Sequence, residues 1–203
     1  MRAAVLEEPG KPVSIRQDVE IAAPKAGQVS VEVRHCGLCH SDLSIIDGVF
    51  PGMMPLVLGH EMVGVVEKSN EARFPRGERV VVNPLFPCFQ CSNCLSGCHN
   101  TCHNWRLLGM DDVQGAFAEW VCVPTSALFP VPHDLADEVA VLPEPVACAV
   151  HLLSLARPDS FGTLAILGAG TQGVLVVMLA RLLGYQSIFV TDVNRKRLAV
   201  ADQ

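Results

Sequence analysis

Four cysteines stand close together in the sequence, in the pattern Cys88-x2-Cys91-x2-Cys94-x7-Cys102. At this spacing four thiolates can converge on one tetrahedral metal ion, and a site made only of thiolates is typical of structural zinc. The surrounding lobe, residues 83–104, offers little apolar material for a core. Metal binding would therefore contribute the free energy that folds it. A disulfide cluster is the alternative, but an odd total of nine cysteines without a recognisable secretion signal favours zinc.

A glycine-rich turn is the second group of residues with a chemical use. Gly168, Gly170 and Gly173 form the pattern G-x-G-x-x-G between a strand-like apolar run and a helical stretch. Such a turn brings backbone amides and a helix N-terminus to the pyrophosphate of a dinucleotide. Asp192 follows 19 residues after the last glycine, where its carboxylate would bind the ribose hydroxyls of NAD and repel the extra phosphate of NADP. A purely structural turn beside a solvated aspartate is the alternative.

A third group combines one thiol, one imidazole and carboxylates. It comprises residues 37–42 (GLCHSD) and residues 59–61 (GHE). Catalytic zinc typically keeps three protein ligands and one open position for water or substrate. Taken singly, a free cysteine and a core histidine are explained by packing alone. Beside a thiolate cluster and a dinucleotide turn, Cys39 and His60 instead predict a second metal site.

Two parts of the sequence with different residue patterns must position these groups. Up to about residue 130 the chain reads as short strands between Gly and Pro, with no helical stretch of convincing length. Residues 29–34 alternate with period two, and residues 79–82 and 120–123 are β-rich runs, so this part predicts an all-β, barrel-like domain. Residues 135–156 are rich in Ala and Leu and have helical character, and residues 157–160 read as a connector.

The remaining sequence has the pattern of a βαβ unit. Residues 163–167 form an apolar run typical of a buried parallel strand. A helix is expected over residues 171–183, ending at Gly184. A second strand is expected over residues 187–191, and a further helix begins at Arg195.

Composition excludes several classes of protein. The formal net charge is −6 and the longest basic run is three residues, which argues against nucleic-acid or anionic-membrane partners. The longest apolar stretch, residues 174–183, contains Arg181 and is too short to span a bilayer. The acidic N-terminal stretch does not resemble a signal peptide. We therefore expect a soluble, cytoplasmic protein.

Together these motifs resemble the zinc-containing medium-chain alcohol and polyol dehydrogenases, and the resemblance runs along the whole chain, including residues 115–120 (GAFAEW). It implies a two-domain fold that mixes α+β and α/β architecture. Residues 1–156 would form a GroES-like β-barrel catalytic domain, and residues 157–203 would form the first βαβ unit of an incomplete Rossmann NAD-binding domain. Cys39 and His60 match the family's catalytic zinc ligands, and the four clustered cysteines match its structural zinc.

The resemblance leaves the other ligands of the catalytic zinc open. Glu61 corresponds to a glutamate that binds the metal or lies just behind it. Glu144, in the sequence PEPVAC, matches the glutamate of the polyol and threonine dehydrogenase branch, whereas other members use a cysteine in this region, for which Cys148 is the candidate. We favour Glu144 and interpret Cys148 as a core residue. Cys98, a fifth thiol in the lobe, has no role in the family and is interpreted as a bystander, a replacement ligand or an oxidation site.

Residues beside the expected metal have implied roles of their own. Ser41 would hydrogen-bond the substrate hydroxyl and begin a proton relay. Family members often carry a histidine three residues later, where this chain has Ser44, so His40 or water would complete the relay. Asp42 would either orient the imidazole of His60 or cap a loop.

The implied activity is hydride transfer between an alcohol or polyol and NAD, with one catalytic and one structural zinc and a homo-oligomer as the full enzyme. A complete doubly wound domain has about six strands, whereas two are expected here. The chain would thus be a fragment or truncated form of such an enzyme. The alternative is a non-catalytic zinc-binding protein that retains the first half of the fold.

Overall fold

The computed structural model describes residues 1–21, 23–50, 52–110, 112–156 and 162–202, which fall into two compact units. The first unit is Met1–Leu142 and the second is Pro143–Gln203. The helix α4 (Pro143–Ala156) thus groups with the second unit, although the sequence-based domain limit was placed after it. The connector expected at residues 157–160 lies outside the described residues, and the domain limit stays a prediction.

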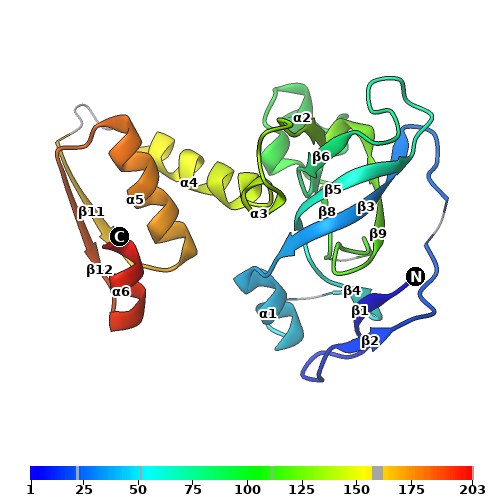
Figure 1. Cartoon of the computed structure of the whole chain (residues 1–203), viewed down its shortest axis with the longest axis horizontal. Coiled ribbons are helices and arrows are strands. Elements are labelled where there is room, and N and C mark those ends of the chain that lie inside the picture. The colour runs from blue at the N-terminus through cyan, green and yellow to red at the C-terminus, as the bar shows by residue number, and fades with distance from the viewer. Residues whose placement is uncertain (22, 51, 111, 157–161, 203) are drawn as a thin grey trace. The chain divides into compact units, whose positions relative to one another are not determined.

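The first unit is built on antiparallel sheets (Figure 1). Five strands form the main sheet in the order β10-β6-β5-β3-β9. Their bounds are β3 (Gln28–Gly37), β5 (Glu61–Lys68), β6 (Arg79–Val82), β9 (Trp120–Pro124) and β10 (Leu128–Pro130). Two smaller sheets contain β1 (Ala3–Leu6), β2 (Ser14–Arg16) and β4 (Leu56–Val57), and β7 (Leu85–Phe86) with β8 (Arg106–Leu107). The predicted barrel-like, β-rich first part is confirmed.

Burial explains why these segments form strands. Val29 and Val31 in β3 are fully buried, and Val80 and Val82 in β6 belong to the same core. Apolar residues at every second position place one face of the sheet on this core. The pairing of β3 with β5 sets Gly37 opposite Glu61, and this register brings the ends of both strands to the candidate metal site.

Short helices interrupt the β-rich part, which the sequence did not lead us to expect, whereas α3 (Asp137–Ala140) lies within residues 135–156, where helical structure was expected. Helix α1 (His40–Ile46) starts directly after Cys39. Helix α2 (Ser92–Leu95) and the 3₁₀ turn η1 (His99–Thr101) lie in the cysteine lobe. The turn η2 (Thr125–Ala127) and helix α3 follow β9 and β10. All span seven residues or fewer, too short for a helical hydrophobic period to show in the sequence.

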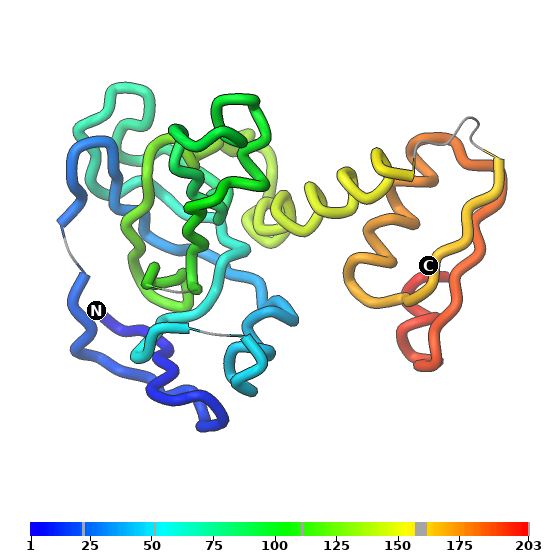
Figure 2. Tube along the Cα trace, turned by 180° about the vertical axis from the view of Figure 1, so that it is seen from behind, coloured from blue at the N-terminus to red at the C-terminus, as the bar shows by residue number. Residues whose placement is uncertain are grey.

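The second unit contains the expected βαβ arrangement. Strands β11 (Thr163–Leu167) and β12 (Ser187–Thr191) are parallel neighbours (Figure 2), and α5 (Thr171–Leu183) connects them. Gly184 closes α5 in the left-handed conformation, at φ 85°, as the sequence predicted. Helix α6 (Arg195–Ala201) follows.

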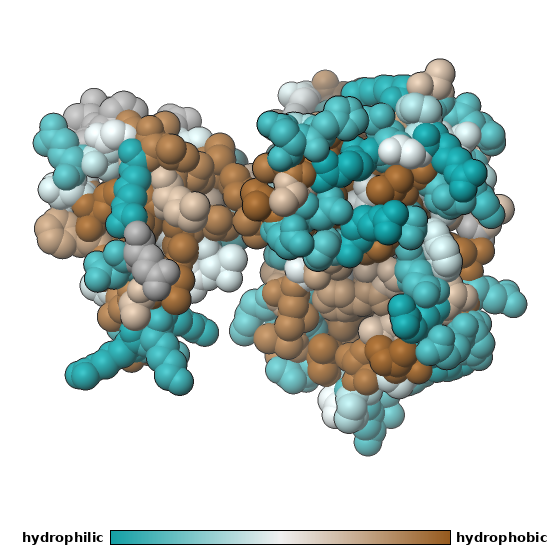
Figure 3. All heavy atoms as spheres, viewed as in Figure 1, coloured by the Kyte–Doolittle hydropathy of each residue, from teal (hydrophilic) through white to brown (hydrophobic). Residues whose placement is uncertain are grey.

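Helix α5 packs against both strands of this small sheet, α4 packs against α5, and the shared core includes Ile166, Leu175 and Val177. Side chains on the other face, Leu167 and Phe189 among them, are exposed. Figure 3 shows many apolar side chains at the surface of this unit. No helix among the described residues is both long and apolar enough to cross a membrane.

Candidate metal centres and cofactor turn

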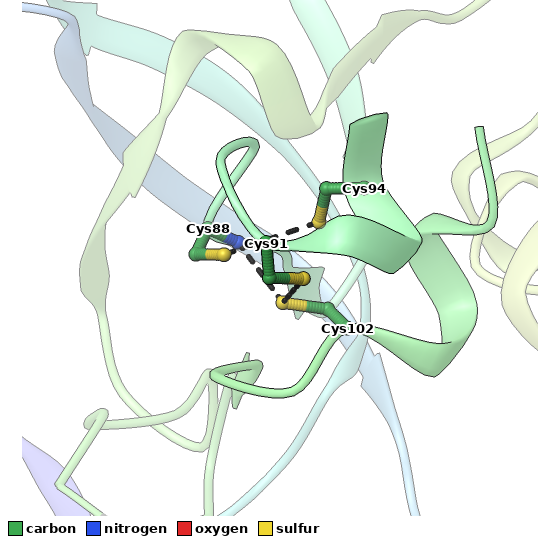
Figure 4. Close-up of side chains that lie close together, drawn as sticks. All are labelled: Cys88, Cys91, Cys94 and Cys102. Carbon is green, nitrogen blue, oxygen red and sulfur yellow. Dashed lines mark hydrogen bonds between the residues drawn. The ribbon is translucent and has the colours of Figure 1, made fainter. Parts of the chain in front are cut away.

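The four clustered cysteines point toward one another (Figure 4). Their sulfur atoms all lie within 4.8 Å of one another. The Sγ atoms of Cys88 and Cys94 are 4.0 Å apart, and those of Cys91 and Cys102 are 3.9 Å apart. Tetrahedral zinc with Zn–S bonds of about 2.3 Å requires S–S separations of about 3.8 Å, whereas a disulfide requires about 2.05 Å. The geometry fits one zinc ion and excludes disulfides within this cluster.

The surroundings of the thiols in the lobe also change their pKa values. The backbone N–H groups of His103 and Cys94 lower the pKa of Cys91 to about 6, whereas burial raises the pKa of Cys94 to about 12. Backbone N–H groups of Cys88 and Asn104 both donate to the sulfur of Cys102, over 3.2 and 3.3 Å. At Cys91 the donated hydrogen bonds favour the thiolate, which is the form that binds zinc. Cys98 is exposed and outside the four-sulfur group.

A second group of ligands lies where β3 and β5 meet. One ligand atom each from Cys39, His60 and Glu61 lies within 4.8 Å of the other two. Cys39 precedes α1, and His60 and Glu61 stand at the start of β5. A thiol, an imidazole and a carboxylate are a suitable donor set for zinc. Among the described residues of the first unit, these three and the cysteine lobe are the groups that can hold a metal ion.

The position of Asp42 is compatible with both of the functions considered for it. Its Oδ1 lies 3.5 Å from Nδ1 of His60, and neither side chain is more than 7% exposed. Its Oδ1 also accepts from the Gly59 N–H (3.0 Å), and its Oδ2 accepts from the Cys39 N–H (2.9 Å). Asp42 therefore caps α1 and holds the backbone before two ligands, while facing the imidazole nitrogen that would leave Nε2 for a metal.

The charges of this group are coupled. The hydrogen bond with His60 lowers the pKa of the Cys39 thiol, against the opposing effect of burial. Burial lowers the pKa of His60, but hydrogen bonds and charge from Asp42 and Cys39 outweigh it and raise the pKa to about 10. Cys39 and His60 therefore each favour the charged form of the other, and a divalent cation bound between them would take over this interaction.

The other residues predicted for this site are placed as follows. Ser41 Oγ lies 3.7 Å from Cys39 Sγ, and His40 is exposed at the first position of α1. Glu144 belongs to the second unit, in the first turn of α4, where the Cys148 thiol donates to its Oε1 over 3.8 Å. Cys148 is exposed, so its interpretation as a core residue is wrong for this structure. Prolines on both sides of Glu144 fit the first turn of a helix, where a backbone N–H has no helical partner.

The glycine turn has the geometry expected for a dinucleotide site. Gly168 has φ 108°, and a Cβ on Gly173 would collide with the Gly168 carbonyl. A Cβ on Gly170 would meet nothing within 4 Å, which leaves space beside the N-terminus of α5. Asp192 accepts hydrogen bonds from the backbone N–H groups of Asn194 (2.7 Å) and Ala169 (2.8 Å), which lower its pKa. The residues therefore fit NAD, with an ionised carboxylate tied to the turn.

Two features near the mixed cluster were missed from the sequence. Cys36 is half-buried next to Gly59, and burial together with the charges of Asp42 and Glu61 raises the pKa of its thiol. Residues 114–117 lie against the backbone that leads to His60. Gly109 and Gly115 could have indicated a close approach of two backbones, but the sequence alone does not show which backbone they approach.

The family of the chain follows from comparison with known proteins. Residues 25–133 match the alcohol dehydrogenase GroES-like domain. The chain belongs to the zinc-type alcohol dehydrogenase family. Galactitol 1-phosphate 5-dehydrogenase of Escherichia coli K12 is 33% identical over 176 residues, covering 86% of this chain and 51% of that protein.

Solved structures of this family have the same fold as the chain. A zinc-binding dehydrogenase from Sinorhizobium meliloti 1021 bound to NADP is 34% identical with a TM-score of 0.92, over 99% of this chain and 58% of that one. An alcohol dehydrogenase (rspB) from Escherichia coli CFT073 complexed with NADH is 32% identical with a TM-score of 0.90, over 100% of this chain and 59% of that one. These matches confirm the predicted GroES-like domain followed by the beginning of a Rossmann domain. The chain spans about 60% of the length of curated relatives that it matches over nearly all of its own length.

Proposed function

We propose that this chain forms part of an NAD-dependent dehydrogenase that oxidises an alcohol or polyol at a zinc site. The observation that carries the proposal is the convergence of Cys39, His60 and Glu61, with Asp42 facing the imidazole. Bound there, zinc would lower the pKa of a substrate hydroxyl and favour its alkoxide. The four clustered cysteines would hold the second, structural zinc, in agreement with their sulfur separations.

The side chains have separate roles in this proposal. Cys39 and His60 bind the metal, Asp42 fixes the tautomer and direction of His60, and Glu61 and Glu144 are the candidates for the remaining ligand. Ser41 stands close enough to Cys39 to receive the substrate proton beside the metal. His40, exposed at the start of α1, is the group through which we propose that the proton continues to solvent.

The proposed cofactor is NAD. Gly168, Gly170 and Gly173 provide the turn, and the N-terminus of α5 provides amide groups for the pyrophosphate. Asp192 carries its negative charge at the position of the adenosine ribose, which favours NAD over NADP. Solved relatives are bound to NADP or to NADH. In this proposal the Asp192 carboxylate is the group that distinguishes NAD from NADP.

The proposed substrates are small polyols or sugar alcohols. Support comes from the Glu144-Pro145 pair in α4 and from relatives named as galactitol 1-phosphate, D-altritol and sorbitol dehydrogenases. A homo-oligomer and a cytoplasmic location complete the proposal, and native mass spectrometry and cell fractionation would test them.

Metal content and turnover test the proposal together. Two zinc equivalents per chain and NAD-dependent oxidation of at least one member of a polyol panel are expected for the native protein. Native mass spectrometry would show whether the protein carrying this activity is heavier than 21.8 kDa. A single zinc equivalent would contradict the catalytic site. Two equivalents without oxidation of any polyol would favour the non-catalytic zinc-binding alternative.

A further inference from the structure

A stretch of backbone runs alongside the segment that leads into His60. Consecutive amide groups on one side donate to consecutive carbonyls on the other, namely Gly115 to Val57 (2.7 Å), Ala116 to Gly59 (2.9 Å) and Phe117 to Leu58 (2.8 Å). Gln114 adds its side chain, because its Oε1 accepts from the Val57 N–H (2.8 Å) and its Nε2 donates to the Pro55 carbonyl (3.3 Å). We call Gln114–Phe117 the backing segment.

Glycines allow the two backbones to approach this closely. A Cβ on Gly115 would lie 2.5 Å from the Gly59 carbonyl oxygen, and a Cβ on Gly109 would lie 2.8 Å from the same atom. Gly59 itself has φ 95°, and a Cβ there would lie 2.7 Å from the Phe117 ring. Backbone atoms cannot yield as flexible side chains do, so any residue larger than glycine would displace the turn before His60.

Gly59, the residue before His60, is therefore held from two directions. The Gly59 N–H donates to Asp42, and the Gly59 carbonyl accepts from the Ala116 N–H. His60 is only 6% exposed, so its imidazole has little freedom to compensate for a displaced backbone. The position of one metal ligand thus depends on residues more than 50 positions away in the sequence.

We propose that the backing segment is a positioning element for the catalytic metal site. It fixes the backbone of residues 57–59 so that His60 and Glu61 enter β5 with their side chains directed at Cys39, and it touches no metal or substrate itself. This inference rests on the proposed function, because it presumes that the mixed cluster binds a metal. It gives a role to residues 115–117, which carry no reactive group that the proposed chemistry needs.

Cadmium-113 NMR tests the proposal without any need for turnover. Cadmium in the four-thiolate site and cadmium in the mixed site give separate resonances, so each site has its own reading. Gln114→Ala removes the hydrogen bond to Val57 and should release cadmium from the mixed site to a chelator about 10-fold faster, with the four-thiolate resonance unchanged. Gln114→Glu keeps an oxygen acceptor for the Val57 N–H but loses the donor to the Pro55 carbonyl, and should recover part of the slow release.

Gln28→Ala is the matched control, because Gln28 likewise accepts from a backbone N–H, that of Lys25 (3.2 Å), but at the far end of β3. It should leave both resonances as in the parent chain. Gly115→Ala provides a stronger variant, and should shift or broaden the mixed-site resonance. Parent-like spectra and release rates in both Gln114→Ala and Gly115→Ala would overturn the proposal, as would equal acceleration at both sites.

The same measurement separates this inference from the function on which it rests. A parent chain that binds a single cadmium, with a four-thiolate resonance only, would refute the catalytic metal site, and the positioning role with it. The positioning role alone would be refuted by a different result. The parent would give two resonances, and the mixed-site resonance would be lost in His60→Ala but unchanged in variants of the backing segment.

Discussion

The four-thiolate cluster and the mixed cluster assemble their ligands in different ways. Cys88, Cys91, Cys94 and Cys102 all come from one lobe, and local turns bring them together. Phe89 and Gly97 adopt positive φ within this lobe, at 57° and 84°, and so reverse the chain over short distances. The mixed cluster instead depends on the pairing of β3 with β5 and on distant supports such as Asp42. One site is local in the sequence, and the other is a product of the fold.

This difference predicts that the two sites respond independently to mutation. The lobe has little core of its own, so its metal is part of its folding. The mixed site lies against the hydrophobic clusters around Leu58 and Met62, so its backbone should persist without metal. Cys102→Ser and His60→Ala each change one metal site and leave the other as an internal reference.

The largest effect is expected for Cys102→Ser. A structural zinc site of this kind binds with on the order of 12 kcal/mol, so loss of one thiolate in four should lower its affinity at least about 100-fold. Zinc analysis should show the loss of one equivalent, and hydrogen exchange should accelerate over residues 88–104. Cys98→Ser is the matched control, because Cys98 is an exposed thiol of the same lobe outside the cluster, and full metal retention is expected. Metal loss in that variant would instead identify Cys98 as a ligand.

The next largest effect is expected for His60→Ala. Loss of a direct ligand should empty the mixed site, by about 100-fold or more in affinity, while the four-thiolate site keeps its metal. Metal counting and hydrogen exchange together would check this, because the lobe should remain protected. His40→Ala changes an exposed histidine next to the ligand Cys39 and should keep both metals. Loss of the lobe's metal in His60→Ala would show that the sites are coupled and would contradict the comparison.

The same contrast explains what could be predicted from the sequence. The spacing of the four cysteines, the glycine turn before α5 and the alternating residues of β3 are local patterns, and the structure confirms the corresponding elements. Helix α1 is too short to show a hydrophobic period. The backing segment was missed because its contacts are main-chain hydrogen bonds over more than 50 residues, which depend on tertiary packing and not on residue type.

A smaller effect is expected for Glu144→Gln, which tests the ligand proposed from the second unit. An amide keeps the size of the side chain but is a much weaker metal ligand than a carboxylate, so affinity at the mixed site should fall about 10–100-fold. Cys148→Ser, one helical turn away on α4, should leave that affinity unchanged. The opposite ranking in metal titrations of the two variants would assign the ligand to Cys148, and no change in either would exclude α4 from the site.

The smallest effect is expected at the glycine turn, which is local in sequence like the cysteine lobe but binds no metal. Asp192→Asn removes a charge from the site proposed for the ribose while keeping an oxygen that can accept from Ala169 or Asn194. Loss of one charge-assisted hydrogen bond should weaken NADH binding about 10-fold and reduce the preference for NADH over NADPH, as measured by fluorescence titration. Asp202→Asn, at the exposed end of α6, is the matched control and should bind both cofactors like the parent. An unchanged preference in Asp192→Asn would mean that the carboxylate serves only to hold the turn, and that the discrimination between the cofactors lies elsewhere in the protein.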